Sequence, residues 1–426
     1  MGILRSFNVG VSGLTATGQG MGVIADNIAN AGTNGFKGSR AEFQDVLATS
    51  LKGIDGGDQF GAGTRLAHIK PIMTQGDVAR TDSITDIAIN GDGFFNIKAP
   101  FGPGYTRDGS FHFNKEGELV NSDEYPVLGY VADAEGKITN KMDAIKIGNT
   151  AIPAAGTSEV KLNINLDSRA DIVPFNPEDP ENTSQFAHSI TVYDNIGTQR
   201  QVTLFYEKTG VNQFKYHAMV DGAEAEGGVE GKFTEMASGT LKFNDKGVLQ
   251  EEIEESNAFN FNKGAAQGQQ IKFNFGKSIA EGGDGIDAAT QYGTNSNVAR
   301  HTQDGFQAGT LASMSFDDDG ILTAVYDNGE SRDISQIAIA KFENNEGLFK
   351  VGKNLFKESR KSGQVANGKP GEFGRGEVLS KSLELSNVDI ANEFVDLMKG
   401  QRNFSANAKT LTTADQMLQD VLQIKR

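Results

Sequence analysis

Apolar residues recur every seven positions at both ends of the chain, whereas apolar and polar residues alternate through its middle. Near the N-terminus the repeat consists of Phe7, Leu14, Met21 and Ile28, with Leu4 and Val11 on companion positions. Near the C-terminus it consists of Ile390, Leu397, Phe404, Leu411 and Leu418, with Phe394 and Leu422 on companion positions. A seven-residue apolar repeat is typical of a coiled coil. We therefore expect two terminal helices that pack through these residues.

The expected helices cover residues 1–30 and about 387–425. Ser386-Asn387-Val388-Asp389 has the pattern of a capping box that would start the second helix. The interior of the first helix contains five glycines, at positions 10, 13, 18, 20 and 22. Each interior glycine costs about 1 kcal/mol relative to alanine, or about 5 kcal/mol in total. Two interpretations follow: a helix docked on its own domain, or one that orders on assembly, with small residues that allow close helix contact.

The alternating pattern between residues 72 and 380 predicts β-strands. Leu162, Ile164 and Leu166 alternate with polar residues, and so do Val202 and Leu204. Residues 31–71 are polar and rich in glycine, which predicts a linker or long loop. The sequence thus predicts an α+β multidomain fold with nested, mainly antiparallel β domains. The expected parts are an N-terminal helix (1–30), a linker (31–71), a first β domain in two segments (72–147 and 301–380), an inserted outer β domain (148–300) and a C-terminal helix (381–426).

A short pattern of Phe, Asn or Asp, two polar residues, Gly, any residue and Leu occurs three times. It spans residues 113–119, 243–249 and 316–322. The Asn or Asp side chain can bond to the backbone of a turn, and the glycine can adopt a positive φ. Each copy therefore predicts a β-hairpin.

Composition narrows the possible functions. The 426-residue chain is 37% hydrophobic and 23% charged, which is sufficient for a buried core. It contains no cysteine, which excludes disulfides, zinc–cysteine sites and thiol nucleophiles. A formal net charge of −16 disfavours nucleic-acid and membrane-surface binding. No segment has the length of a membrane span, and the N-terminus lacks the apolar region of a cleaved signal peptide. We expect no membrane insertion and, for a secreted chain, an export route without such a signal.

The sequence motifs that could indicate a phosphate-binding or calcium-binding site are incomplete. Residues 347–354 resemble a phosphate-binding loop, but Asn354 replaces the hydroxyl residue that binds Mg²⁺. Residues 282–287 match a single start of a calcium β-roll, and residues 315–320 resemble an EF-hand loop with Tyr326 in place of its final carboxylate. The five histidines are scattered along the sequence. We expect turns at these motifs, no catalytic residues, no cofactor and no metal.

One long motif near the N-terminus resembles the bacterial flagellar rod and hook family. Its residues are Asn27, Ile28, Ala29, Asn30, Thr33, Gly35, Phe36 and Lys37. The segments Leu383–Asp389 and Gln401–Ala408 resemble the closing helix of that family. Residues 189–194 and 202–210 resemble the additional β domain of its hook members. The resemblance covers nearly the whole chain.

The resemblance implies an extracellular structural subunit of the hook that is not an enzyme. Such a subunit leaves the cell through the flagellar type III export apparatus and polymerises with copies of itself into a curved, flexible tube that transmits torque from rod to filament. It also implies contacts with the distal rod protein, the hook cap protein and the hook–filament junction protein. The family's terminal helices are disordered in the free monomer. Gly400 departs from the family pattern, because it lies in the middle of the closing helix, where a stronger helix former would be expected. It weakens that helix.

Other functions are compatible with the residues. The nearest alternative is a distal rod protein of the same family, for which the extra β domain would be unexpected. A calcium-dependent adhesin would require calcium to raise its melting temperature. A soluble enzyme would require clustered ionisable groups in a pocket.

Overall fold

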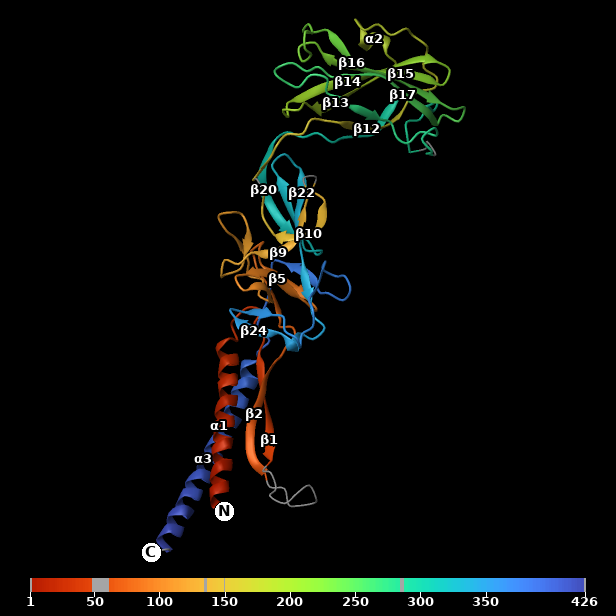
Figure 1. Ribbon diagram of the computed structural model, residues 1–426. Helices are drawn as coiled ribbons and strands as arrows, with labels where there is room; N and C mark the ends of the chain where they lie inside the picture. Colours follow the sequence, from red (N-terminus) through yellow and green to blue (C-terminus); the bar gives the residue numbers. More distant parts are fainter. Residues whose placement is uncertain (1, 48–60, 134–135, 149, 284–286, 425–426) are drawn as a thin grey trace. The chain divides into compact units, whose positions relative to one another are not determined.

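The computed structural model describes residues 2–47, 61–133, 136–148, 150–283 and 287–424. The protein is mostly β, with helices at its termini, and it divides into two compact units (Figure 1). The first comprises Met1–Gly148, Ser313–Ala324 and Ser331–Arg426, and the second comprises Asn149–Ala312 and Val325–Glu330. The second unit includes nearly all of the segment expected as an inserted domain, 148–300, and continues beyond it.

The two long helices belong to the first unit and pack against each other. They are α1 (Gly2–Ala29) and α3 (Ile390–Ile424) (Figure 1). The expected start of the second helix at Asn387 is wrong. Asp389 caps α3, because its Oδ1 accepts hydrogen bonds from the backbone N–H groups of Ala391 (2.8 Å) and Asn392 (3.3 Å).

An antiparallel hairpin follows α1, where the sequence predicted a linker or long loop. Its strands are β1 (Ser39–Leu47) and β2 (Gly61–Pro71). Residues 48–60 of the expected linker lie outside the described residues. The hairpin packs along α1, and a Cβ atom at Gly20 would lie only 2.8 Å from the ring of Phe43. A glycine in α1 therefore makes room for an aromatic ring of the hairpin.

The rest of the first unit is a set of antiparallel pairs around two clusters of buried apolar residues. The main sheet has the order β20-β21-β22-β9-β5-β6-β25-β24. The strands are β3 (Val78–Arg80), β4 (Ile87–Asn90), β5 (Phe94–Ala99), β6 (Gly102–Thr106), β7 (His112–Phe113), β8 (Leu119–Val120), β9 (Val127–Ala132), β10 (Ile138–Ala144), β20 (Gly309–Phe316), β21 (Ile321–Tyr326), β22 (Ser331–Ile337), β23 (Ile339–Lys341), β24 (Phe349–Gly352), β25 (Leu355–Lys357), β26 (Ala366–Gly368), β27 (Glu377–Ser380) and β28 (Ser382–Glu384). Strands β20 and β21 contribute residues to both units.

The second unit is a β-sandwich. A five-stranded antiparallel sheet, β13-β14-β15-β16-β17, and a three-stranded sheet, β18-β12-β19, share one apolar core. The elements are β11 (Ala151–Ile152), β12 (Glu159–Asn165), α2 (Pro180–Thr183), β13 (Phe186–Tyr193), β14 (Gln199–Gly210), β15 (Gln213–Asp221), β16 (Phe233–Phe243), β17 (Leu249–Asn257), β18 (Lys272–Asn274) and β19 (Asn297–Gln303).

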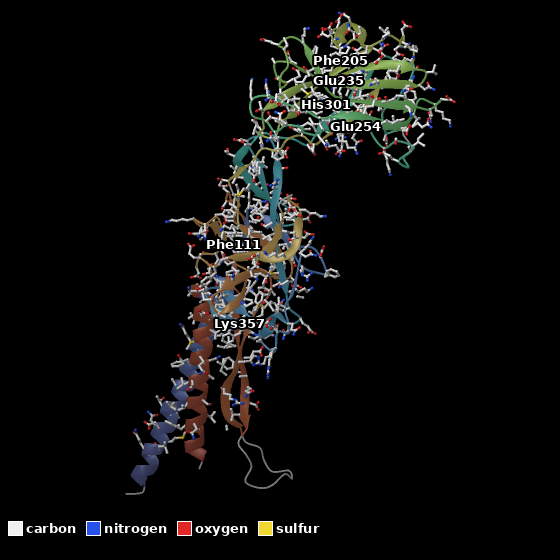
Figure 2. All side chains as sticks on the ribbon, turned by 45° about the horizontal axis from the view of Figure 1, so that its top comes forward. Phe111, Phe205, Glu235, Glu254, His301 and Lys357 are labelled. Atoms are coloured by element: carbon white, nitrogen blue, oxygen red, sulfur yellow. The ribbon has the colours of Figure 1, made fainter. Side chains whose placement is uncertain are left out.

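The predicted alternation is confirmed in β12 and holds only in part in β14. Leu162 and Ile164 are buried, and their neighbours in β12 face outward. In β14, Phe205 (labelled in Figure 2) is buried on the opposite face from Leu204. The ring of Phe175 lies 6.4 Å from that of Phe205, centroid to centroid, and helps to cover this face. The strand is therefore buried on both sides, by the sandwich core on one face and with the help of the Phe175 loop on the other.

All three predicted hairpins are confirmed. Phe113 pairs with Leu119, Phe243 pairs with Leu249, and β20 pairs with β21. The side chains of Asn114, Asn244 and Asp317 each accept a backbone N–H bond from the residue four positions later. The glycines at positions 117, 247 and 320 have φ values of 75°, 76° and 70°. The repeated pattern is thus a repeated turn.

The second unit has a half-buried carboxyl group on the core side of its larger sheet. Glu252 on β17 is paired with the fully buried Leu241 of β16, so that both side chains are on the core side of the sheet. Burial raises the pKa of Glu252 to about 7, and the neighbouring carboxylates of Glu281 and Glu254 add to the shift. The folded unit consequently holds a proton that the unfolded chain releases at lower pH.

We therefore expect the second unit to lose stability as the pH rises from about 4.5 to about 7. The contribution of Glu252 is fully present below its ordinary pKa and is lost as the pH rises through the raised value. Glu252→Gln should remove this dependence and be more stable than wild type above pH 7, by on the order of 1–3 kcal/mol. Urea unfolding at several pH values measures the effect. Glu230→Gln, at an exposed carboxylate of the same unit, should keep the wild-type pH profile, and an identical profile for both variants would contradict the assignment.

Candidate functional site

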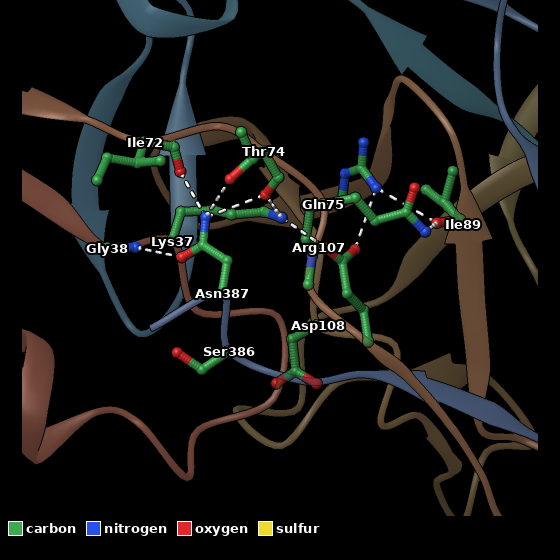
Figure 3. A network of polar contacts seen from close by, with 12 residues as sticks. Lys37, Gly38, Ile72, Thr74, Gln75, Ile89, Arg107, Asp108, Ser386 and Asn387 are labelled. Carbon is green, nitrogen blue, oxygen red and sulfur yellow. Dashed lines mark hydrogen bonds and ion pairs between the residues drawn. The ribbon is translucent and has the colours of Figure 1, made fainter. Parts of the chain in front are cut away.

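The two ends of the chain meet in a buried polar junction of the first unit. We define the junction as residues 27–39, 72–76, 89–91, 107–108 and 384–393. It connects the end of α1, the start of β1, the end of β2 and the start of α3 (Figure 3). Sequence separations between its partners reach 366 residues. The junction thus connects the beginning of the chain to its end.

An ion cluster occupies the centre of the junction. One carboxylate oxygen of Glu384 accepts hydrogen bonds from Nζ of Lys37 (2.5 Å) and the backbone N–H of Gly76 (2.9 Å). The other oxygen accepts from Nη1 of Arg107 (3.0 Å). All three charged side chains are at most 4% exposed. Glu384 is therefore a buried anion that two cations share.

Backbone carbonyls also accept hydrogen bonds from both cations, although the buried Nε of Arg107 has no partner among the described residues. Lys37 also donates to the carbonyl of Thr74 at 2.7 Å, and Arg107 donates to Ile89 at 3.3 Å and Gly91 at 2.6 Å. Burial lowers the pKa of Lys37, whereas the carboxylate of Glu384 opposes that shift. The charged form of Lys37 thus depends on Glu384, since a buried ammonium without a partner is strongly unfavourable.

Two asparagines link the terminal helices to the β1–β2 hairpin through hydrogen bonds. Asn27 of α1 is 2% exposed; its amide donates to the carbonyl of Ser39 (2.8 Å) and its oxygen accepts from the N–H of the same residue (2.9 Å). It also donates to Oε1 of Glu393 on α3 (2.9 Å). Asn387 bonds in a similar way to Gly38 (2.9 Å) and to the carbonyls of Ile72 and Thr74. Each side chain satisfies backbone groups that no strand partner satisfies.

Gly35 and Phe36 allow the chain to turn into this cluster. Gly35 has a φ of 64°, and a Cβ atom there would lie within 2.7 Å of the backbone of Arg107 and Asp108. Its N–H donates to the carbonyl of Glu384 at 2.7 Å. Nζ of Lys350 lies 5.0 Å from the ring centre of Phe36. Only glycine fits this backbone conformation and space.

The family-motif residues predicted from the sequence thus have different structural roles. Asn27, Gly35, Phe36 and Lys37 make the contacts above. Asn30 donates to the carbonyl of Asp26, and Thr33 donates to Oδ1 of Asn30, which shapes the turn after α1. Ile28 is half-buried and Ala29 is exposed. The functional roles of the motif residues remain predictions.

Sequence reasoning missed three residues of the junction: Arg107, Glu384 and Asn387. Glu384 lies 347 residues from Lys37, and no local pattern identifies it as the partner of Lys37. The signal available was chemical: a lysine that is buried requires an anion as its partner.

The structure places only some of the predicted seam residues between α1 and α3. Gly10 and Gly13 are buried against Leu411 and Asn407, and Met21 lies against Gly400. Phe7, Leu14, Met21, Ile28, Leu397, Leu411 and Leu418 are half-buried, whereas Val11, Ile390, Phe394 and Phe404 are exposed. Leu4 and Leu422 lie outside the described side chains. Glycines bring the helices close at this contact, and four of the predicted seam side chains remain exposed.

Gly400 has a packing role that sequence analysis did not anticipate. A Cβ atom at this position would lie 2.9 Å from Cγ of Met21. The glycine that weakens α3 as an isolated helix therefore lets α1 approach it.

The incomplete chemical motifs are turns or loops. Residues 347–354 form part of the β24–β25 hairpin, and residues 315–320 form the β20–β21 turn. The β-roll match lies partly outside the described residues. Nε2 of His188 and Nδ1 of His301 lie 3.4 Å apart, but no three ligand-type side chains gather into a metal-binding group within the described ranges. Over those same ranges, no helix has the length and apolar character that crossing a bilayer requires.

Comparison with known proteins places the chain among flagellar axial proteins. Four family models match successive segments: Flagella basal body rod protein (7–37), Flagellar hook protein FlgE/F/G D1 domain (88–168), Flagellar basal body protein FlaE D2 domain (165–306) and Flagellar basal body rod FlgEFG protein C-terminal (379–424). The flagellar hook protein FlgE of Borreliella burgdorferi is 33% identical over 99% of this chain and 100% of its own length. This chain belongs to the flagellar hook protein family.

Other members of the hook protein family agree in length and fold. The FlgE hook protein of Escherichia coli is 30% identical, with 99% of this chain and 100% of the relative aligned. The crystal structure of the Helicobacter pylori hook protein FlgE2 matches with a TM-score of 0.54 at 13% identity. The match covers 72% of this chain and 100% of the FlgE2 chain. Its similarity supports the fold. The family prediction from the sequence is confirmed, and the family is one of structural proteins.

We predict that Glu384→Gln destabilises the first unit of this hook-family protein by about 3–5 kcal/mol, because two buried cations lose their shared anion. Glutamine keeps the shape of the side chain, so the loss reflects charge. Urea unfolding of the purified protein provides the measurement. The matched control is Glu346→Gln, whose carboxylate pairs with Lys70 at the surface and should contribute at most about 1 kcal/mol. Equal effects of the two variants would show that the cluster is not a stabilising centre.

Proposed function

We propose that this chain is exported unfolded through the flagellar type III apparatus and polymerises into the curved tube of the flagellar hook. The tube would transmit torque from the rod to the filament as a universal joint. Family membership supports the role of structural subunit. The observation that carries the proposal is the set of exposed apolar side chains on α1 and α3, which includes Val11, Phe394 and Phe404.

The terminal helices would form a coiled coil with those of neighbouring subunits. Phe394 is 50% exposed and Phe404 is 40% exposed, although both lie on the predicted seam. Full burial of such a side chain contributes about 1.5–3 kcal/mol. Several burials would offset the cost of the glycines in α1, which is about 5 kcal/mol. Folding of the tails would then be coupled to assembly, as the family resemblance implies.

The β units would remain folded and form the outer layers of the tube. Charged side chains project widely from their surfaces (Figure 2). Contacts between polar, acidic surfaces are hydrated and do not lock a single register. Such contacts would let neighbouring subunits slide as the tube bends. The D2-domain match over residues 165–306 favours a hook subunit over a distal rod protein.

The proposed partners follow from this position in the flagellum. Besides copies of itself, the subunit would contact the distal rod protein at one end and the hook cap and hook–filament junction proteins at the other. We place it outside the cell. A net charge of −16 agrees with the absence of nucleic acid among the proposed partners.

Cells that lack this gene should build a rod without a hook, and the wild-type gene on a plasmid should restore curved hooks. Electron microscopy of isolated basal bodies tests this prediction. Hooks of normal length in the deletion strain, or a missing distal rod, would contradict the hook assignment.

Polymerisation should raise the helix content, and Gly13→Ala should reduce this gain relative to Gly22→Ala. Both variants gain about 1 kcal/mol of helix propensity. A Cβ atom at Gly13 would lie 2.8 Å from the side chain of Asn407, whereas the space at Gly22 is open. The difference therefore isolates the α1–α3 contact. Circular dichroism before and after assembly measures it, and unchanged helicity of the wild type would exclude coupled folding.

A further inference from the structure

The most exposed large apolar side chain in the described part of the chain lies on a rigidly held loop of the first unit. Phe373 is 89% exposed. It is part of residues 369–376, here called the Phe373 loop, which connects β26 to β27. The Phe373 ring belongs to neither of the two apolar core clusters described for the first unit.

The backbone of Phe373 is strained. Its φ is 51°, in the left-handed region that side chains larger than Asn rarely adopt. Gly371 and Gly374 on either side also have positive φ values, of 73° and 72°. Evolution could relieve this strain with one more glycine. The position instead keeps a phenylalanine that gains no burial within its own chain, which indicates that the ring is used elsewhere.

Hydrogen bonds hold the loop in one conformation. The Arg375 guanidinium donates to the carbonyls of Ala366, Asn367 and Glu372 at 3.1–3.4 Å, and its centre lies 6.0 Å from the Phe373 ring. Nζ of Lys341 donates to the carbonyl of Gly374 at 2.8 Å. A loop fixed in this way presents its aromatic side chain at little entropic cost to binding.

Val211, which is 87% exposed, offers a contrast. It lies in the tight turn between β14 and β15, where the neighbouring Asn212 has a φ of 57°. The turn geometry dictates the exposure of Val211. The longer Phe373 loop has no such requirement for an apolar residue at its tip.

We propose that Phe373 is an anchor for contact between subunits, inserting into the surface of a second copy of this chain. The inference rests on the proposed polymerisation, because a homopolymer places a second copy beside every loop. After the Phe373 loop the chain continues through β27 and β28 to Glu384 and then to α3. The buried junction therefore connects Phe373 to the seam residues of α3. Protein interfaces are enriched in phenylalanine and arginine relative to the rest of the surface.

The test uses the full-length chain with Phe373→Gly and Lys381→Gly. Lys381 is also exposed and has a φ of 49°, so both substitutions relieve similar backbone strain. We expect both purified monomers to melt at or above the wild-type temperature. Phe373→Gly should raise the critical concentration for polymerisation about tenfold or more, whereas Lys381→Gly should leave it unchanged. Wild-type assembly of Phe373→Gly would overturn the proposal.

A second measurement does not depend on how the glycine variant folds. A photo-crosslinking phenylalanine analogue at position 373 should yield a covalent adduct between two copies of this chain in assembled hooks. No adduct, or an adduct only with a different flagellar protein, would overturn the second-copy assignment. Failure of the proposed function and failure of the anchor can be told apart. If the wild-type chain itself forms no hooks in the same experiment, the proposed function is wrong. If it forms hooks but the analogue gives no adduct, only the anchor assignment is wrong.

Discussion

The first unit depends on one buried carboxylate shared between two cations. Glu384 accepts from Lys37 and Arg107, and these three residues come from distant parts of the chain. Removing Glu384 leaves two buried cations without their shared counter-ion, which is far more costly than losing a surface pair. The ion cluster therefore requires that the segment after α1, the β core and the segment before α3 fold together.

The neighbouring asparagines extend this requirement to the helices. Asn27 joins α1 to the first turn of α3 and to β1, and Asn387 joins the α3 entry to the hairpin. The junction thus fixes where both helices start from the β core. Several apolar side chains of the helices remain exposed beyond it, and the proposed assembly would bury them.

Small residues set the distance between the helices. Gly10, Gly13 and Gly400 lie in the α1–α3 contact, and a Cβ atom at Gly13 or Gly400 would lie only 2.8 or 2.9 Å from a side chain of the other helix. The same glycines disfavour an isolated helix. Helix propensity and helix packing therefore act in opposite directions, and packing decides the structure. This balance agrees with the proposal that the terminal helices become ordered on assembly.

The sequence by itself determined the features that depend on neighbouring residues. It predicted the terminal helices, the alternation in β12 and the three hairpins at positions 113, 243 and 316, because turn chemistry and periodicity are local. Prediction from the sequence failed where contacts between distant segments determine the structure. Residues 39–47 and 61–71 pair as a hairpin, Asp389 and not Ser386 caps α3, and Phe175 helps to bury the outer face of β14. Only the tertiary structure brought Glu384 to Lys37, since the pairing of buried charges depends on chain topology and leaves no periodic trace in the sequence.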